Sequence, residues 1–163
     1  MKINLEELYS LQAKLDEDIA INHHVDYKST HSRRLLALMV ELGELANETR
    51  CFKYWSNKAP SAKEIIMDEY ADGLHFLLSL GIPLHTSKFE YELKKNDEDL
   101  TDQFHQMYAL GNKLHNEYDL ANYQDAMQYY LNMALSLGMD EKDIIASYKT
   151  KLAVNHKRQE TNY

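Results

Sequence analysis

The fold class follows from the stretch L-L-A-L-M-V-E-L-G-E-L-A, residues 35–46. Its apolar side chains recur every three or four residues and so form one stripe of a helix: Leu35, Leu38, Met39, Leu42, Leu45 and Ala46. Glu41, Glu44 and the following Glu48 share the opposite arc. The pattern predicts an amphipathic helix that begins at Ser29 or Thr30 and ends near Arg50.

A second pair of acids lies in E-Y-A-D, residues 69–72, on the next predicted helix. Glu69 falls among apolar residues of that helix, and Asp72 lies within a few tens of degrees of Ile65 and Phe76 around its circumference. Acids seldom occupy an apolar stripe without a partner. This pair therefore points to a ligand more strongly than Glu41 and Glu44, which by themselves are typical of a solvated helix face.

Together the two pairs predict a metal site. Two ionised carboxylates about 6 Å apart, at an effective dielectric of ~20, repel by roughly 3 kcal/mol. That is a large part of the ~5–15 kcal/mol by which a domain is stable. A divalent cation removes this repulsion, and oxygen-only ligands suit Mg²⁺, with Mn²⁺ as a substitute. We expect the ligands to be Glu41, Glu44, Glu69 and Asp72.

The remaining pattern predicts an all-α bundle of roughly five to seven helices in a single domain, residues 1–163. Only 5 Gly and 2 Pro interrupt a sequence rich in helix formers. The other expected boundaries are a first helix over residues 4–21 capped by Asn4, a third from a Ser61–Glu64 capping box to Leu80, a helix over 123–137, and a last helix opened by Asp140 and Asp143.

Two regions of the sequence predict less regular features. Residues 84–119 are weakly periodic, and we expect one or two short helices there, as a variable cap region. Residues 126–137 are apolar around most of their circumference, which suggests more hydrophobic surface than one small bundle buries and hence a symmetric dimer.

Charge and composition exclude several classes. The net charge of −8 argues against a protein that binds nucleic acid or a membrane surface. No apolar run reaches the ~18 residues that span a bilayer. The only cysteine, Cys51, excludes an intramolecular disulfide and fits a reducing compartment, so we expect a cytoplasmic protein.

The last predicted helix carries a cationic and amide stripe at i, i+3, i+7 and i+10: Tyr148, Lys151, Asn155 and Arg158. On an acidic protein, Lys151 and Arg158 could grip phosphates, and Asn155 could read the polar edge of a ring. A solvated C-terminal helix face is the alternative interpretation.

Aromatic and polar side chains near the acids suggest further ligand contacts. Phe52, Tyr54 and Trp55 lie in the loop between the two acidic helices, where they could stack on a planar ligand or pack in the core. His75 follows Asp72 by three residues and so lies one turn along the same helix. Gln12, on the first helix, could present an amide to a base.

These motifs together resemble the dimeric dUTPases of the all-α NTP pyrophosphohydrolase (MazG-like) superfamily. The resemblance runs from the first helix to Gln159 and rests on E-x-x-E at 41–44, E-x-x-D at 69–72 after F-K-Y-W, and the terminal Y-x-x-K-x-x-x-N-x-x-R-Q at 148–159. The acid pairs identify only the superfamily. The terminal N-x-x-R-Q and the chain length point to deoxyuridine nucleotides.

The resemblance implies a homodimer that hydrolyses dUTP to dUMP and pyrophosphate with Mg²⁺. On this interpretation the four acids hold the metal, and Glu41 or Glu44 also orients and deprotonates the attacking water. Lys151 and Arg158 would bind phosphate, with Asn155 at the uracil edge. Gln12, Trp55 and His75 match positions similar to the family's base and sugar contacts.

Three alternatives remain at the level of sequence. A pyrophosphohydrolase for dCTP or for many nucleotides would use the same chemistry, because a side-chain amide can flip to suit uracil or cytosine. A di-iron carboxylate protein would need two E-x-x-H pairs, and only Asp72 with His75 approximates one. A helical partner-binding protein without activity would show no stabilisation by Mg²⁺.

Overall fold

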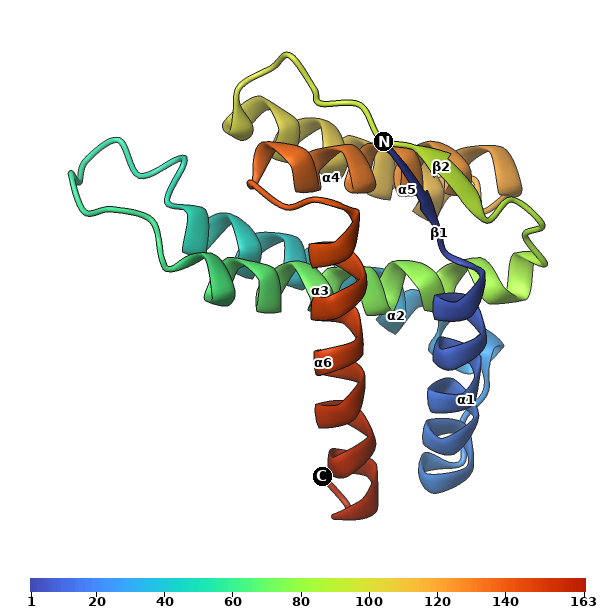
Figure 1. Cartoon of the computed structure of the whole chain (residues 1–163). Coiled ribbons are helices and arrows are strands. Elements are labelled where there is room, and N and C mark those ends of the chain that lie inside the picture. Colours follow the sequence, from blue (N-terminus) through green and yellow to red (C-terminus); the bar gives the residue numbers. More distant parts are fainter.

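The computed structural model describes residues 1–163 and contains six α-helices, one 3₁₀ helix and a two-stranded ribbon (Figure 1). The elements in chain order are β1 (Lys2–Asn4), α1 (Glu6–His23), α2 (Tyr27–Thr49), α3 (Lys63–Gly81), η1 (Ile82–Leu84), β2 (Glu90–Glu92), α4 (Leu100–Asn116), α5 (Leu120–Ser136) and α6 (Glu141–Glu160). The prediction of an all-α fold with five to seven helices is confirmed. None of the helices combines the length and hydropathy needed to cross a membrane.

The helices are arranged in three groups (Figure 1). The antiparallel pair of α2 and α3 runs through the middle, α4 and α5 lie on one side of it with the ribbon, and α1 and α6 leave the other side at a steep angle. A single cluster of 31 buried apolar residues draws on all six helices and both strands. The loop between α2 and α3, residues 50–62, extends beyond the other elements and is called the arm below.

The segment 84–119 differs from the expectation of one or two short helices. It forms the strand β2 and one full helix, α4. β2 pairs antiparallel with β1, placing Ile3 opposite Tyr91, and both side chains are buried. α4 adds Phe104 and Met107 to the core. Strands of three residues were not predicted because they are too short to show a period of two.

The start of α2 also differs from its prediction. Asp26 is the N-cap: its carboxylate accepts a hydrogen bond from the Ser29 backbone N–H at 2.7 Å, and the Ser29 hydroxyl accepts from the Asp26 N–H at 3.1 Å. Ser29 therefore occupies the N3 position of a capping box rather than the N-cap, and the helix begins earlier than expected. The predicted end at Arg50 is confirmed, since Arg50 is the C-cap.

Two other predicted caps are wrong, and one is confirmed. Asn4 lies in β1, although its side chain still accepts from the Glu6 N–H at 2.9 Å. The Ser61–Glu64 box does not form, because the Ser61 hydroxyl donates to Glu48 of α2 instead and Ala62 becomes the N-cap. At α6, Asp140 and Asp143 form the capping box that the sequence predicts: Asp140 accepts from Asp143 N–H at 2.9 Å.

Two tyrosines of α5 occupy the space left by glycines of α3. A Cβ at Gly73 would clash with the Tyr130 hydroxyl, and one at Gly81 would clash with Tyr123. Tyr130 donates to the Tyr70 carbonyl at 2.7 Å, Tyr70 donates to the Tyr130 carbonyl at 3.0 Å, and the two rings stack 4.5 Å apart. These contacts fix the position of the helix that carries Glu69 and Asp72.

The apolar circumference of α5 is explained within the chain. Ala126, Met127, Tyr130, Leu131 and Met133 are fully buried against neighbouring helices of the same molecule. The inference that residues 126–137 need a second subunit to cover them is therefore not supported by the structure.

We predict that Gly73→Ala lowers the free energy of unfolding by about 1–3 kcal/mol, because the added methyl group overpacks against the Tyr130 hydroxyl. Urea denaturation measures this change. In a Tyr130→Phe background the same substitution should cost less, since the clashing oxygen is gone. An equal cost in both backgrounds would contradict this account of the packing.

Candidate active site

Three carboxylates from two helices gather on one side of the α2–α3 pair. Glu41 comes from α2 and Glu69 and Asp72 come from α3, and one ligand oxygen of each lies within 4.8 Å of the others. The spacing of three along α3 brings its two acids to the same face, and the antiparallel packing of α2 supplies the third. Glu44, one turn further along α2, is exposed and lies outside this set of three.

Two of these carboxylates carry buried oxygens without a partner. Oε2 of Glu41 and Oε2 of Glu69 accept no hydrogen bond. Burial, followed by the charge of Asp72, raises the pKa of Glu41 to about 8, and a hydrogen bond with Glu44 adds to the shift. Burial and the charge of Asp72 likewise raise the pKa of Glu69 to about 7. Unpaired, desolvated carboxylate oxygens are the groups that a cation would satisfy.

Asp72, unlike Glu41 and Glu69, already has an ion-pair partner, which is Lys151. Its ammonium is 2.9 Å from Asp68 and 3.1 Å from Asp72, and only 6% of the residue is exposed. Burial opposes the charged form of Lys151, but Asp68 and Asp72 outweigh it and raise its pKa. Burial also raises the pKa of Asp72, and Lys151 counters that shift.

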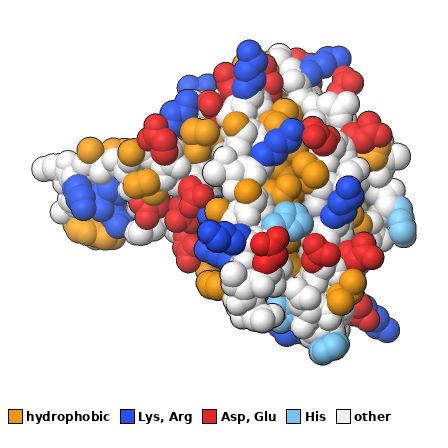
Figure 2. All heavy atoms as spheres, turned by 60° about the horizontal axis from the view of Figure 1, so that its bottom comes forward, with side chains coloured by type: hydrophobic (Ala, Val, Ile, Leu, Met, Phe, Trp, Pro, Cys, Tyr) orange, Lys and Arg blue, Asp and Glu red, His pale blue; other side chains and the backbone are white.

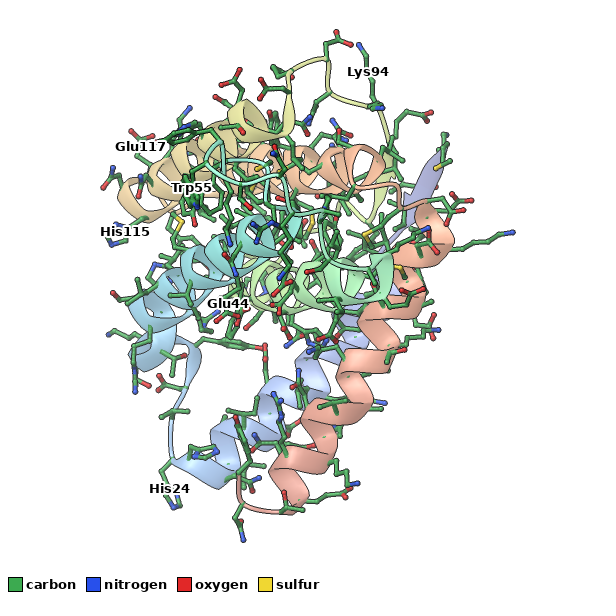
Figure 3. All side chains as sticks on the ribbon, turned by 90° about the vertical axis from the view of Figure 1, so that its left-hand side faces the viewer. His24, Glu44, Trp55, Lys94, His115 and Glu117 are labelled. Carbon is green, nitrogen blue, oxygen red and sulfur yellow. The ribbon has the colours of Figure 1, made fainter.

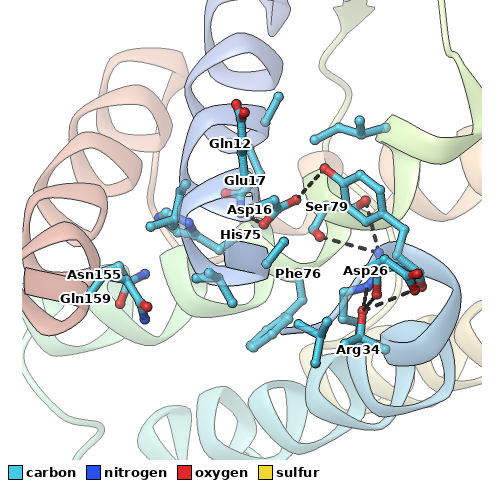
Figure 4. A pocket seen from close by; sticks show the side chains of 18 of the residues that line it. Gln12, Asp16, Glu17, Asp26, Arg34, His75, Phe76, Ser79, Asn155 and Gln159 are labelled. Carbon is cyan, nitrogen blue, oxygen red and sulfur yellow. Dashed lines mark hydrogen bonds between the residues drawn. The ribbon is translucent and has the colours of Figure 1, made fainter. Parts of the chain in front are cut away.

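A pocket of about 650 Å³ opens beside the acids, between α1, α2, α3 and α6 (Figure 4). Six of the residues predicted from the sequence line it: Gln12, Glu41, Asp72, His75, Asn155 and Arg158. They come from four helices. In Figure 4, Asn155 and Gln159 of α6 face the pocket from one side, and Arg34 of α2 lies on the opposite side.

Five other predicted residues do not line the pocket, and two of them are the acids Glu44 and Glu69 described above. Tyr148 is fully buried behind it, and Lys151 is held by the ion pairs described above. Trp55 lies in the arm, where it is 64% exposed, and Figure 3 shows it above α2 while Glu44 lies below. The aromatic loop is thus neither core nor part of this chain's own pocket.

His75 occupies the pocket wall as a neutral ring. Its pKa is lowered to about 4 by burial, although a hydrogen bond to the Tyr148 carbonyl at 3.4 Å opposes the shift. The imidazole stacks on the Tyr148 ring, with centroids 4.2 Å apart. At neutral pH it therefore adds a polar, uncharged surface to a pocket that is acidic at one end.

A polar network in the pocket was not predicted from the sequence. The Tyr27 hydroxyl donates to Asp16 at 3.0 Å, and Arg34 donates to the Tyr27 carbonyl at 2.8 Å and to the Ser79 carbonyl at 3.1 Å. The one available signal was Asp16 at i+4 from Gln12 on the first helix. Tyr27, Arg34 and Ser79 join only because α1, α2 and α3 meet here.

The arrangement suits an elongated ligand with a polyanionic end and a planar polar end. Carboxylates that could hold a divalent cation lie at one end with Arg158 nearby, and amides, a neutral imidazole and the hydrogen-bonded Asp16 and Arg34 line the remainder. Phe76 and Ile82 supply apolar surface between polar groups. A metal-bound triphosphate joined to a nucleoside has this distribution of charge and polarity.

Comparison with known proteins agrees with this geometry. A family model described as dUTPase matches residues 4–163, which is nearly the whole chain and includes every residue of the pocket. No curated protein matches the chain. The match and the carboxylate cluster lead to one conclusion: the chain belongs to the all-α dUTPase family and is a dUTP diphosphatase.

Proposed function

We propose that this dUTPase hydrolyses dUTP to dUMP and pyrophosphate in the pocket between α1, α2, α3 and α6, with Mg²⁺ at the acid cluster. The observation that carries the proposal is the pair of buried, unpartnered oxygens on Glu41 and Glu69 within reach of Asp72. An all-oxygen set favours Mg²⁺, or Mn²⁺ in its place, over Zn²⁺. The core shared by all helices supports treating residues 1–163 as one catalytic domain.

The metal would be held by Glu41, Glu69 and Asp72, with Glu44 one turn away to complete the set. A bound cation supplies positive charge that offsets the negative charge of the phosphate oxygens. Glu44 is exposed beside Glu41, so either carboxylate of this pair can take the proton of the attacking water. Burial raises the pKa of Asp72, and the ion pair with Lys151 opposes that shift by favouring the charged carboxylate.

The remaining pocket residues would bind the nucleotide. Arg158 is a cation that lines the pocket, and we propose that it binds phosphate. Gln12, Asn155 and His75 would contact the base and sugar. Lys151, for which a phosphate contact was expected, is better explained as the partner of Asp68 and Asp72.

We further propose that the enzyme is a homodimer in which the arm of each subunit reaches the other's pocket. The arm contains Arg50, Lys53 and Lys58 and no acid, and its Trp55 and Tyr54 are 64% and 94% exposed. Figure 2 shows basic and hydrophobic side chains at its tip and acidic ones where it joins the body. The cationic arm therefore complements the acidic pocket of a second copy.

The arm is exposed but not loose. Arg50 donates to the Lys58 carbonyl at 3.1 Å and to the Ser56 hydroxyl at 2.9 Å, and Thr101 donates to the Cys51 carbonyl at 3.2 Å. Leu36 and Val40, one turn apart on α2, are 65% and 50% exposed. Exposed aromatic side chains on an ordered loop, and exposed apolar residues on a helix, are both typical of a subunit interface. The single cysteine, which is free, supports a cytoplasmic location.

Activity is tested by incubating the purified protein with Mg²⁺ and each deoxynucleoside triphosphate and measuring pyrophosphate. We expect dUTP to be hydrolysed with the highest kcat/KM. Glu69→Gln should lower kcat by about a hundredfold or more, because it removes a metal ligand. Glu64→Gln, an exposed position on the same helix, is the matched control and should retain activity. A fully active Glu69→Gln enzyme would refute the proposed metal site.

The pH dependence of stability tests the same site. The pKa values of Glu41 and Glu69 lie above their ordinary value of 4.5, so the folded, metal-free protein binds protons more tightly than the unfolded chain does. Its free energy of unfolding should therefore fall as the pH rises from about 5 to about 8. Allowing for solvent screening, Glu69→Gln should restore about 1–2 kcal/mol at pH 8.

Mg²⁺ should likewise raise the free energy of unfolding of the unmodified protein, because the cation takes the place of the protons at the carboxylates. Thermal melts at pH 6 and pH 8, with and without Mg²⁺, measure this. We expect the melting temperature to rise most at pH 8. No change at either pH would mean that the carboxylates do not bind the metal.

The dimer is tested by complementation. Trp55→Ala should weaken activity and Glu69→Gln should abolish it, yet a mixed dimer of the two should regain one complete site, because the second subunit supplies an intact arm to the first. Co-expression with two affinity tags isolates the mixed species, and light scattering gives its mass. A monomer, or a mixed dimer no more active than Trp55→Ala alone, would count against an arm that acts across the interface.

A further inference from the structure

The amide of Gln12 is bonded at both of its polar atoms. Its Nε2 donates to Oδ1 of Asp16 at 2.9 Å, and its Oε1 accepts from the Tyr148 hydroxyl at 3.0 Å. Gln12 is 3% exposed, and both Gln12 and Asp16 line the pocket from α1 (Figure 4).

These two partners determine which way the amide points. The other carboxylate oxygen of Asp16 accepts from the Tyr27 hydroxyl at 3.0 Å, so Asp16 receives hydrogen bonds at both oxygens. Rotating the Gln12 amide by half a turn would place its oxygen against the Asp16 oxygen, two acceptors facing each other. The Tyr148 hydroxyl has a single proton, and Gln12 Oε1 at 3.0 Å is a closer acceptor for it than the Leu8 carbonyl at 3.4 Å, so the hydroxyl donates to Gln12.

We propose that Asp16 and Tyr148 are positioning residues that fix the Gln12 amide, and that this fixed amide selects uracil over cytosine. The inference rests on the proposed function, in which Gln12 contacts the base. The role of Tyr148 then differs from the substrate contact expected from the sequence. Its side chain is fully buried and acts on the substrate through Gln12, without touching the substrate.

The selectivity follows from the polarity of the two bases. Beyond its hydrogen bonds with Asp16 and Tyr148, the Gln12 amide keeps one free N–H and one free lone pair on Oε1. Uracil offers a donor at N3 and an acceptor at O4, whereas cytosine offers an acceptor at N3 and a donor at N4. A freely rotating amide can pair with either base, but one held in a single orientation is complementary to only one of them.

The test measures kcat/KM for dUTP and dCTP in the wild type and in two variants. Tyr148→Phe keeps the ring that stacks on His75 and removes only the hydroxyl, and Asp16→Asn allows the Gln12 amide to bond in either orientation. We expect each variant to narrow the dUTP-to-dCTP ratio by about tenfold.

Tyr9→Phe is the matched control. Tyr9 is a buried residue of α1 whose hydroxyl lies 2.8 Å from that of Tyr123, so the substitution removes a buried hydrogen bond without touching Gln12. Its stability should fall as in Tyr148→Phe, while its dUTP-to-dCTP ratio stays at the wild-type value.

The outcomes separate this inference from the proposed function. A wild type that hydrolyses neither nucleotide would overturn the proposed function. A wild type selective for dUTP, with folded variants that lose activity on both substrates equally, would overturn the inference alone, because that result describes a merely structural role. If Tyr148→Phe does not fold, Asp16→Asn decides, and an unchanged ratio in that variant overturns the inference.

Discussion

Electrostatic repulsion among carboxylates that helix packing holds together is the constraint on which this site depends. Glu41 approaches Glu69 and Asp72 because α2 and α3 pack along their length, and α5 fixes α3 through tyrosines seated at its glycines. The packing keeps the acids close although their charges oppose it. Burial and, after it, the charges of the neighbouring carboxylates raise the pKa values of Glu41 and Glu69, and a bound cation would relieve both effects.

The pocket divides its two tasks between its two ends. The acids that would face the metal and the phosphates, Glu41 and Asp72, line it together with Arg158. The rest is lined by the uncharged His75 ring, the Gln12 amide, and Asp16 and Arg34, whose charged groups are hydrogen-bonded within the protein. Gln12 and Asn155 lie on α1 and α6 whereas the acids lie on α2 and α3, so that base selectivity could be altered without changing the acids.

The arm is the feature that a single chain does not explain. It projects from the α2–α3 pair with exposed aromatic side chains, yet hydrogen bonds from Arg50 and Thr101 hold its shape. Its positive charge stands out on a protein with a net charge of −8. The proposed second subunit, with the same acidic pocket, would account for the order, the charge and the exposed aromatic residues together.

The sequence by itself determined the helical class, the two acid pairs, the end of α2 at Arg50 and the capping box of Asp140 with Asp143. These features depend on residues within about one helical turn of each other, so periodicity and spacing were sufficient to predict them. Only the tertiary structure decided that Ser61 bonds to Glu48 rather than capping α3, and that β1 pairs with β2. It likewise decided that Lys151 pairs with Asp68 and Asp72. Trp55 was left outside the pocket of its own chain for the same reason. The tertiary structure also decided that Asp16 and Tyr148 hold Gln12 from two different helices. Apart from the bond between Gln12 and Asp16 within α1, each of these contacts joins residues from different elements, and the choice among competing partners is made by which helices pack together.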